Sequence, residues 1–145
     1  MGVIEVSDLS KHYGDVRAVD GISFTVDAGE VFGFLGPNGA GKTTTIRTLL
    51  GFLEPTDGSG TVLDADCTDE PAMIEAKRSI GYLPANPAFE ESATGREILD
   101  LHGSIKGESR RAELLELFDP PLDRRVREYS SGNKQKLGII QSFMH

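Results

Sequence analysis

The chain has 145 residues, of which 38% are hydrophobic and 26% are charged, so it fits one soluble domain or a part of a larger protein. Its 23 acidic and 15 basic side chains give a net charge of -8. An acidic surface repels the phosphates of nucleic acids and of anionic lipids, and we therefore expect no nucleic-acid partner. The same charge balance is typical of a high-salt cytoplasm, although many mesophilic proteins reach it as well.

We expect neither an export signal nor a membrane anchor in this sequence. Its single cysteine, Cys67, excludes a disulfide within the chain and indicates a packing residue in a reducing compartment. The N-terminus resembles neither a secretory signal nor a myristoylation site. No run approaches the roughly 20 apolar residues needed to cross a bilayer. We expect a cytoplasmic protein that could reach a membrane only through a partner.

The first half of the chain predicts strands around one helix. Alternating or continuous apolar residues predict strands near residues 3–6, 22–26, 31–35, 61–63 and 79–83. The run at 31–35 is continuously apolar apart from Gly33, which is typical of a strand buried on both faces. A helix is predicted from about Lys42 to Leu50, with Gly51 at its end.

The second half predicts three helices. Thr94 and Glu97 have the spacing of a capping box, followed by apolar residues at helical intervals to Ile105. A second helix is predicted over 109–118, where Pro120 and Pro121 stop it. A third begins near Gly132, and its apolar period reaches the last residue without a closing signal. We therefore expect the sequence to be part of a longer protein.

Residues 36–43, G-P-N-G-A-G-K-T, match the phosphate-binding pattern G-x-x-x-x-G-K-[ST]. Glycines let the backbone wrap closely around phosphates, and the helix that follows directs the positive end of its dipole at them. Lys42 would contact the β and γ phosphates, and the Thr43 hydroxyl would hold Mg²⁺. The phosphate-binding residues expected from the pattern are Gly36, Asn38, Gly39, Ala40, Gly41, Lys42, Thr43 and Thr44.

Several further stretches resemble, in order, those of a nucleotide-binding subunit of an ATP-binding cassette (ABC) transporter. Residues 9–14, L-S-K-H-Y-G, resemble the segment whose aromatic residue stacks on adenine, which assigns that role to Tyr13. Residues 79–84 resemble the strand that enters the Q-loop, and residues 94–118 the helical subdomain that faces a membrane partner. Residues 129–137 resemble the L-S-G-G-Q signature, in which Ser130 and Gly132 would face the γ-phosphate held by a second subunit. The stretch 130–132 could also be only an N-cap for the last helix, and the two interpretations are compatible, because a helix N-terminus is itself an anion site.

The resemblance implies an α/β fold: a P-loop NTPase core with an N-terminal antiparallel β subdomain and an α-helical subdomain, truncated before the Walker B strand. Its parts would be a nucleotide-binding part (1–88), a helical subdomain (89–130) and an incomplete signature helix (131–145). It further implies ATP and Mg²⁺ as ligands, a transmembrane permease and a second nucleotide-binding subunit as partners, and a place at the inner face of the cell membrane. The residues of the loop and of the stretch 81–84 resemble those of drug-efflux or other export subunits more than those of sugar importers.

Two departures and one absence qualify this resemblance. The Q-loop glutamine position holds Ala85, whose methyl group can neither join Mg²⁺ nor couple to a permease, and Asn86 is a weak substitute. In the signature, Ser131 stands for the first glycine and Asn133 for the usual glutamine. The family's catalytic Glu and switch His have no counterpart, and we interpret the three histidines, His12, His102 and His145, as structural or exposed. We expect no catalytic residue in this chain, and no ATP hydrolysis by it alone.

Two other functions stay open on the sequence. A soluble ABC ATPase of translation or DNA repair would share the loop, but the acidic balance argues against one. An unrelated P-loop kinase or GTPase would make Tyr13 and the signature stretch coincidences.

Overall fold

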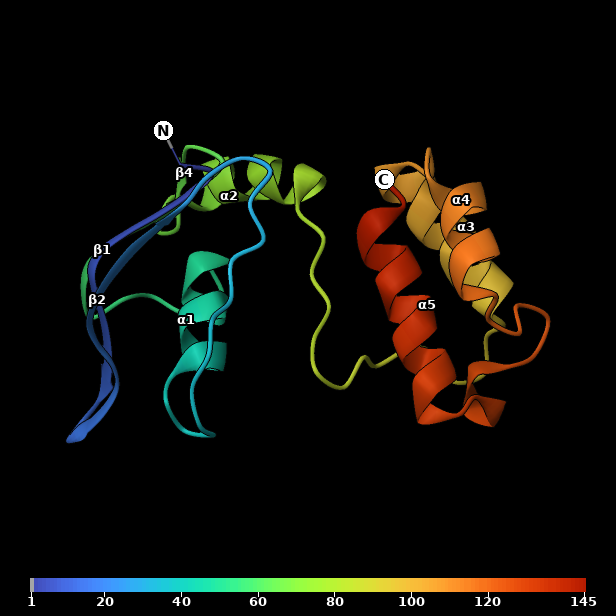
Figure 1. The fold of residues 1–145 in the computed structure, drawn as a ribbon, viewed down its shortest axis with the longest axis horizontal. Helices are drawn as coiled ribbons and strands as arrows, with labels where there is room; N and C mark the ends of the chain where they lie inside the picture. Colours follow the sequence, from blue (N-terminus) through green and yellow to red (C-terminus); the bar gives the residue numbers. More distant parts are fainter. Residues whose placement is uncertain (1) are drawn as a thin grey trace. The chain divides into compact units, whose positions relative to one another are not determined.

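The computed structural model describes residues 2–145, which form two compact units, one that ends at Arg78 (unit 1) and one that spans Ser79–His145 (unit 2) (Figure 1). Unit 1 combines an antiparallel sheet with two short helices, and unit 2 is helical. This agrees with the predicted α/β class. Over the described range, no helix combines the length and the apolar character that a bilayer span requires.

The sheet of unit 1 has four antiparallel strands in the order β2-β1-β3-β4. Strands β1 (Ile4–Tyr13) and β2 (Val16–Val26) form a long hairpin, in which Ile4 opposes Val26 and Tyr13 opposes Val16. Strand β3 (Asp57–Val62) pairs with the other edge of β1, and β4 (Ala65–Asp66) follows after a turn. The predicted strands near 3–6, 22–26 and 61–63 are confirmed, although each begins or ends several residues away from the prediction.

Helix α1 (Lys42–Leu49) packs against the sheet through β2 and β3. Gly60 permits the close approach, since a Cβ there would lie 2.6 Å from Leu49 Cδ2. The core of unit 1 is mainly apolar, with the buried hydroxyl residues Ser10, Thr45 and Thr48, and it includes the buried thiol of Cys67, whose pKa is raised by burial. Cys67 is therefore a packing residue, as the sequence indicated.

Helix α2 (Glu70–Ala76) was not predicted, although its start signals are in the sequence. The Asp69 side chain accepts from the Ala72 backbone N–H at 3.1 Å, and Pro71 lies in the first turn. Both features are typical of a helix N-terminus. A 3-10 turn, Lys77–Ser79, follows it.

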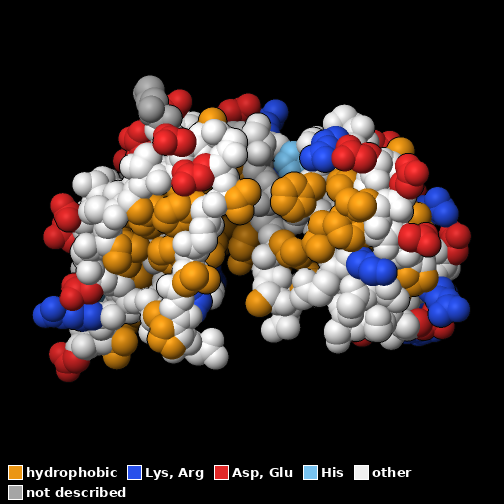
Figure 2. All heavy atoms as spheres, viewed as in Figure 1, with side chains coloured by type: hydrophobic (Ala, Val, Ile, Leu, Met, Phe, Trp, Pro, Cys, Tyr) orange, Lys and Arg blue, Asp and Glu red, His pale blue; other side chains and the backbone are white. Residues whose placement is uncertain are grey.

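Two of the predicted strands are wrong. Residues 31–35 and 79–83 have no ladder partner within the described chain, and Val31 and Leu35 are 99% and 94% exposed. A strand buried on both faces needs a neighbour at each edge and cover on each face. Within this segment, the rings of Phe32 and Phe34 lie 5.2 and 5.5 Å from that of Phe24. Figure 2 shows hydrophobic side chains gathered on the visible face of each unit.

Unit 2 packs helices α3 (Gly95–Lys106), α4 (Arg111–Phe118) and α5 (Ser131–Phe143) around one apolar cluster, with a 3-10 turn at Val126–Glu128. All three predicted helices are confirmed, but the third was expected to run to His145, whereas α5 ends at Phe143 with Met144 as its C-cap. The predicted capping box is present: Thr94 N–H donates to Glu97 Oε2 at 2.8 Å, and Glu97 N–H donates to Thr94 Oγ1 at 3.2 Å. The cluster consists of Leu99, Leu114, Val126, Tyr129, Leu137, Ile140 and Met144.

Candidate functional site

The loop 36–41 turns sharply because two of its glycines occupy the left-handed region. Gly39 has φ +85° and Gly41 has φ +90°, values that residues with a Cβ rarely adopt. The Ala40 N–H donates to the Pro37 carbonyl at 3.1 Å, which closes the turn. The chain then enters α1 directly, with Gly41 as N-cap.

The N-terminus of α1 has no side-chain cap. Helix α4 also lacks one, whereas α2, α3 and α5 are capped by Asp69, Thr94 and Ser130. The first backbone N–H groups of α1 therefore remain available next to the loop, where they and the helix dipole favour an anion. This is the arrangement that a phosphate loop requires.

Lys42 is held by the loop itself. Its ammonium donates to the Gly36 carbonyl and, at 3.0 Å, to the Pro37 carbonyl. No carboxylate pairs with it within residues 2–145. Phosphate oxygens are stronger acceptors than neutral carbonyls, so the ammonium can exchange these partners for a bound phosphate.

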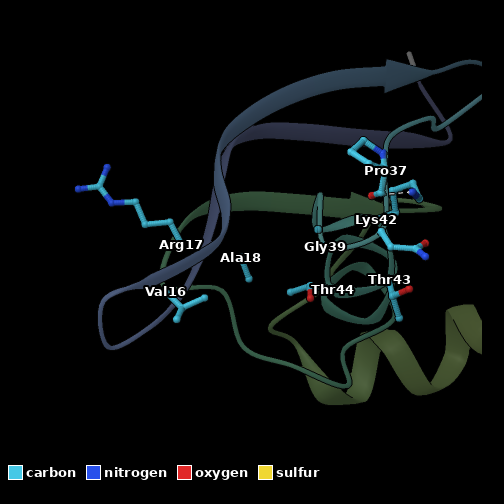
Figure 3. Close-up of a pocket in the computed structure, with 10 residues that line it drawn as sticks. Val16, Arg17, Ala18, Pro37, Gly39, Lys42, Thr43 and Thr44 are labelled. Carbon is cyan, nitrogen blue, oxygen red and sulfur yellow. Dashed lines mark hydrogen bonds between the residues drawn. The ribbon is translucent and has the colours of Figure 1, made fainter.

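The loop and β2 together enclose a pocket of about 310 Å³ (Figure 3). Ligand pockets in proteins begin at roughly this size. Figure 3 shows Thr43 and Thr44 in the first turn of α1, and the side chain of Arg17 extending away from the loop. The lining residues are Val16, Arg17, Ala18, Pro37, Asn38, Gly39, Gly41, Lys42, Thr43 and Thr44.

Six of the predicted loop residues therefore line the pocket, while Gly36 holds the Lys42 ammonium and Ala40 closes the turn. The sequence did not indicate the three residues of β2. They reach the site because the loop packs directly on the backbone of β2 at Gly41. A Cβ on Gly41 would lie 3.2 Å from the carbonyl carbon of Ala18 and closer still to its carbonyl oxygen. No local sequence signal encodes this contact.

Tyr13, expected to stack on the base, is not among the residues that line this pocket. The residue is 48% exposed. Tyr13 directly opposes Val16 across the β1–β2 hairpin, and directly opposed residues project from the same face of a sheet. Tyr13 is therefore the cross-strand neighbour of a residue, Val16, that lines the pocket.

The signature-like stretch belongs to unit 2 and forms the start of α5. Ser130 Oγ accepts from the Asn133 N–H at 3.1 Å, so the N-cap interpretation is confirmed. Ser130 and Gly132 are exposed. The preceding residue, Tyr129, is buried, which raises the pKa of its hydroxyl, and it donates to the Pro121 carbonyl at 2.6 Å. A buried tyrosine thus anchors an exposed helix N-terminus.

Comparison with known proteins decides the family. The family model described as ABC transporter matches residues 19–145. The chain belongs to this family. It is 40% identical to the daunorubicin/doxorubicin resistance ATP-binding protein DrrA of Streptomyces peucetius, over 97% of this chain and 44% of that protein. It is 36% identical to the bacitracin transport ATP-binding protein BcrA of Bacillus licheniformis, over 99% of this chain and 48% of that protein.

The solved structure of an ATP-binding subunit of an ABC transporter has the same fold. It superimposes with a TM-score of 0.83 at 34% identity, over 97% of this chain and 61% of the solved chain. This ABC chain therefore spans about half the length of the curated relatives that it matches. Family membership confirms the resemblance and excludes the unrelated kinase and GTPase alternatives.

The Q-loop position of this ABC chain makes a backbone contact in place of a side-chain contact. The Gln135 amide of α5 donates to the Ala85 carbonyl at 2.7 Å. Further along, Ser142 Oγ donates to the Tyr82 carbonyl at 3.2 Å, and a Cβ on Gly138 would lie 2.5 Å from Leu83 Cδ1. Residues 81–85 thus lie along α5.

The histidines have structural surroundings. His12 Nε2 lies 3.3 Å from Asp20 Oδ1. His102 Nδ1 lies 3.2 Å from the Gln141 amide, and the ring centroids of His102 and His145 are 6.2 Å apart. Burial, followed by the nearby Lys106, lowers the pKa of both His102 and His145. None of the three lines the pocket at the loop.

Proposed function

We propose that residues 36–44 bind the polyphosphate of ATP together with Mg²⁺. The observation that carries the proposal is the N-terminus of α1, which has no side-chain cap, beside a lysine whose ammonium donates to two backbone carbonyls. Both features place positive charge at the loop. The α1 N–H groups and Lys42 would hold phosphate oxygens.

The hydroxyl of Thr43 would supply one oxygen ligand to Mg²⁺. This ion keeps several waters and takes its other ligands from phosphate oxygens and a few protein groups, so a single hydroxyl in the first turn of α1 is a fitting contribution. Tyr13, beside Val16 of the pocket, would stack on the adenine.

The protein that carries this chain would be the ATP-binding subunit of an ABC transporter of the export type. DrrA and BcrA bear the names of a drug-resistance protein and of an antibiotic-transport protein. ATP would join two such subunits head to tail, with the loop of one subunit facing Ser130 and Gly132 of the other. Hydrolysis would release them and move a transmembrane permease, which would place the subunit at the inner face of the membrane.

Hydrolysis needs a group that polarises the attacking water. The lining of the described pocket carries ammonium, guanidinium, hydroxyl and amide groups, none of which is a base suited to this task at neutral pH. We expect the 145-residue chain alone to bind nucleotide without turning it over. Phosphate release by this chain that disappears in Lys42→Ala would contradict this expectation.

The binding proposal is tested by measuring Mg²⁺-ATP affinity for Lys42→Ala against Arg47→Ala. Both changes remove one positive charge from α1, but Arg47 lies in its last turn and does not line the pocket. We expect Lys42→Ala to weaken binding at least tenfold, since hydrogen bonds to charged groups contribute about 1.5–3 kcal/mol, and Arg47→Ala to leave it unchanged. Equal affinities for wild type and Lys42→Ala would end the proposal.

The transport role is tested by identifying the proteins that co-purify with the full-length subunit. A soluble ABC ATPase of translation or repair would purify without a membrane protein, whereas a transport subunit solubilised in mild detergent should carry a multi-span protein with it. Recovery of ribosomes or DNA instead would favour the soluble alternative.

A further inference from the structure

Tyr13 has a cation against one face of its ring. Lys11 lies two residues before it on β1, and its Nζ atom is 5.2 Å from the centroid of the Tyr13 ring. This is within the roughly 6 Å at which an ammonium is attracted to an aromatic face. The same ammonium donates to the Glu54 carbonyl at 2.6 Å.

The carbonyl that holds Lys11 is itself fixed to the sheet. Glu54 lies in the segment that precedes β3, and two hydrogen bonds attach this segment to β1. The Thr56 N–H donates to the Ser10 carbonyl at 2.8 Å, and the His12 N–H donates to Thr56 Oγ1 at 2.9 Å. The position of the Lys11 ammonium therefore follows from the backbone of unit 1.

We propose that Lys11 is a positioning residue for Tyr13, which it holds in the orientation that stacks on the base of a bound nucleotide. This inference rests on the proposed ATP binding at the loop. Because the ammonium covers one face of the ring, a planar base stacks on the other. The ammonium also draws ring electron density to its own side, which lessens the repulsion between the negative faces of ring and base.

The benefit is one of preorganisation. Tyr13 lies at the end of β1 and is about half exposed, so its ring would otherwise sample several rotamers in solvent. Binding that must order a mobile side chain is weaker by the cost of that ordering. Lys11 would reduce this cost before the nucleotide arrives.

The test is Lys11→Met in the full-length protein, with affinities for Mg²⁺-ATP and for Mg²⁺-tripolyphosphate measured by calorimetry. We expect about two- to fivefold weaker ATP binding, the factor that corresponds to an exposed cation–π contact. Tripolyphosphate affinity should be unchanged, because it has no base. Unchanged tripolyphosphate affinity also shows that the variant is folded. Lys11→Arg should restore ATP binding, since a guanidinium also stacks on aromatic faces.

A matched control exists in the same unit. The Lys77 ammonium lies 4.6 Å from the centroid of the Phe52 ring, and neither residue lines the pocket. Lys77→Met removes the same charge from a similar contact and should change neither affinity. A loss of tripolyphosphate affinity in Lys11→Met equal to its loss of ATP affinity would show that Lys11 acts through charge alone, which overturns the proposal.

A double-mutant cycle gives the decisive readout. In a Tyr13→Ala background Lys11→Met should have no further effect on ATP affinity, because its action passes through the ring. An undiminished effect in that background would overturn the positioning role. Unchanged ATP affinity in Lys11→Met, with Lys42→Ala still impaired, would overturn it while leaving the proposed function intact. Failure of the wild type to bind ATP would overturn both.

Discussion

Replacing Gly41 with alanine tests how the phosphate loop is attached to the sheet. Gly41 has φ +90°, and a Cβ on it would lie 3.2 Å from Ala18 C and from Val19 Cγ2, and closer still to Ala18 O. The obstacle is the backbone of β2, which cannot rotate away as a side chain would. The loop or β2 must therefore move.

Gly39 provides the matched control. It has φ +85°, similar to Gly41, but no heavy atom lies within 4 Å of a Cβ built there. Gly39→Ala should therefore show only the cost of a left-handed alanine, about 1–2 kcal/mol. Gly41→Ala adds an overpacking cost of about 1–3 kcal/mol. We expect the free energy of unfolding to fall by about 2–5 kcal/mol in Gly41→Ala.

The assay is chemical denaturation followed by circular dichroism, together with hydrogen exchange of the α1 amides. The exchange measurement isolates unit 1, whereas denaturation reports on both units. The difference between the two variants should be about 1–3 kcal/mol and should appear at α1. Equal destabilisation by the two variants would refute the contact between the loop and β2 that forms the pocket.

Three further predictions concern unit 2. Leu99→Ala truncates a fully buried side chain and should lower the free energy of unfolding by about 2–5 kcal/mol in urea denaturation; a loss below 1 kcal/mol would contradict the observed core. Thr94→Ala removes the cap of α3 and should lower the free energy of unfolding by about 1 kcal/mol. Hydrogen exchange should become faster only at the backbone amides in the first turn of α3. Burial, followed by the charge of Lys106, lowers the pKa of His102 in the folded state, so the unfolded state binds more protons. Stability should therefore be full above the unfolded pKa of about 6.5 and fall as the pH drops below it. In His102→Gln the free energy of unfolding should fall less steeply between pH 7 and 5 than in the wild type. An unchanged dependence on pH would show that His102 does not contribute to it.

The chemistry of the loop could be predicted from the sequence because its parts are adjacent in the chain. Residues 36–43 contain the turn glycines, the lysine and the hydroxyl, and α1 follows at once. The capping box of Thr94 and Glu97 was predictable for the same reason, since its two hydrogen bonds join residues three apart. Interactions within one turn of a helix depend little on the rest of the fold.

Tertiary structure decided which residues of β2 line the pocket and which apolar segments form strands. The apolar run 31–35 satisfied a strand pattern, yet a strand exists only where another segment accepts its hydrogen bonds, and none within residues 2–145 does so. Val16 and Ala18 enter the site through the register of a hairpin and through the contact at Gly41. The sequence by itself determined the local chemistry of the phosphate site. Only packing between distant segments decided what surrounds it, because those contacts join residues whose proximity no local pattern encodes.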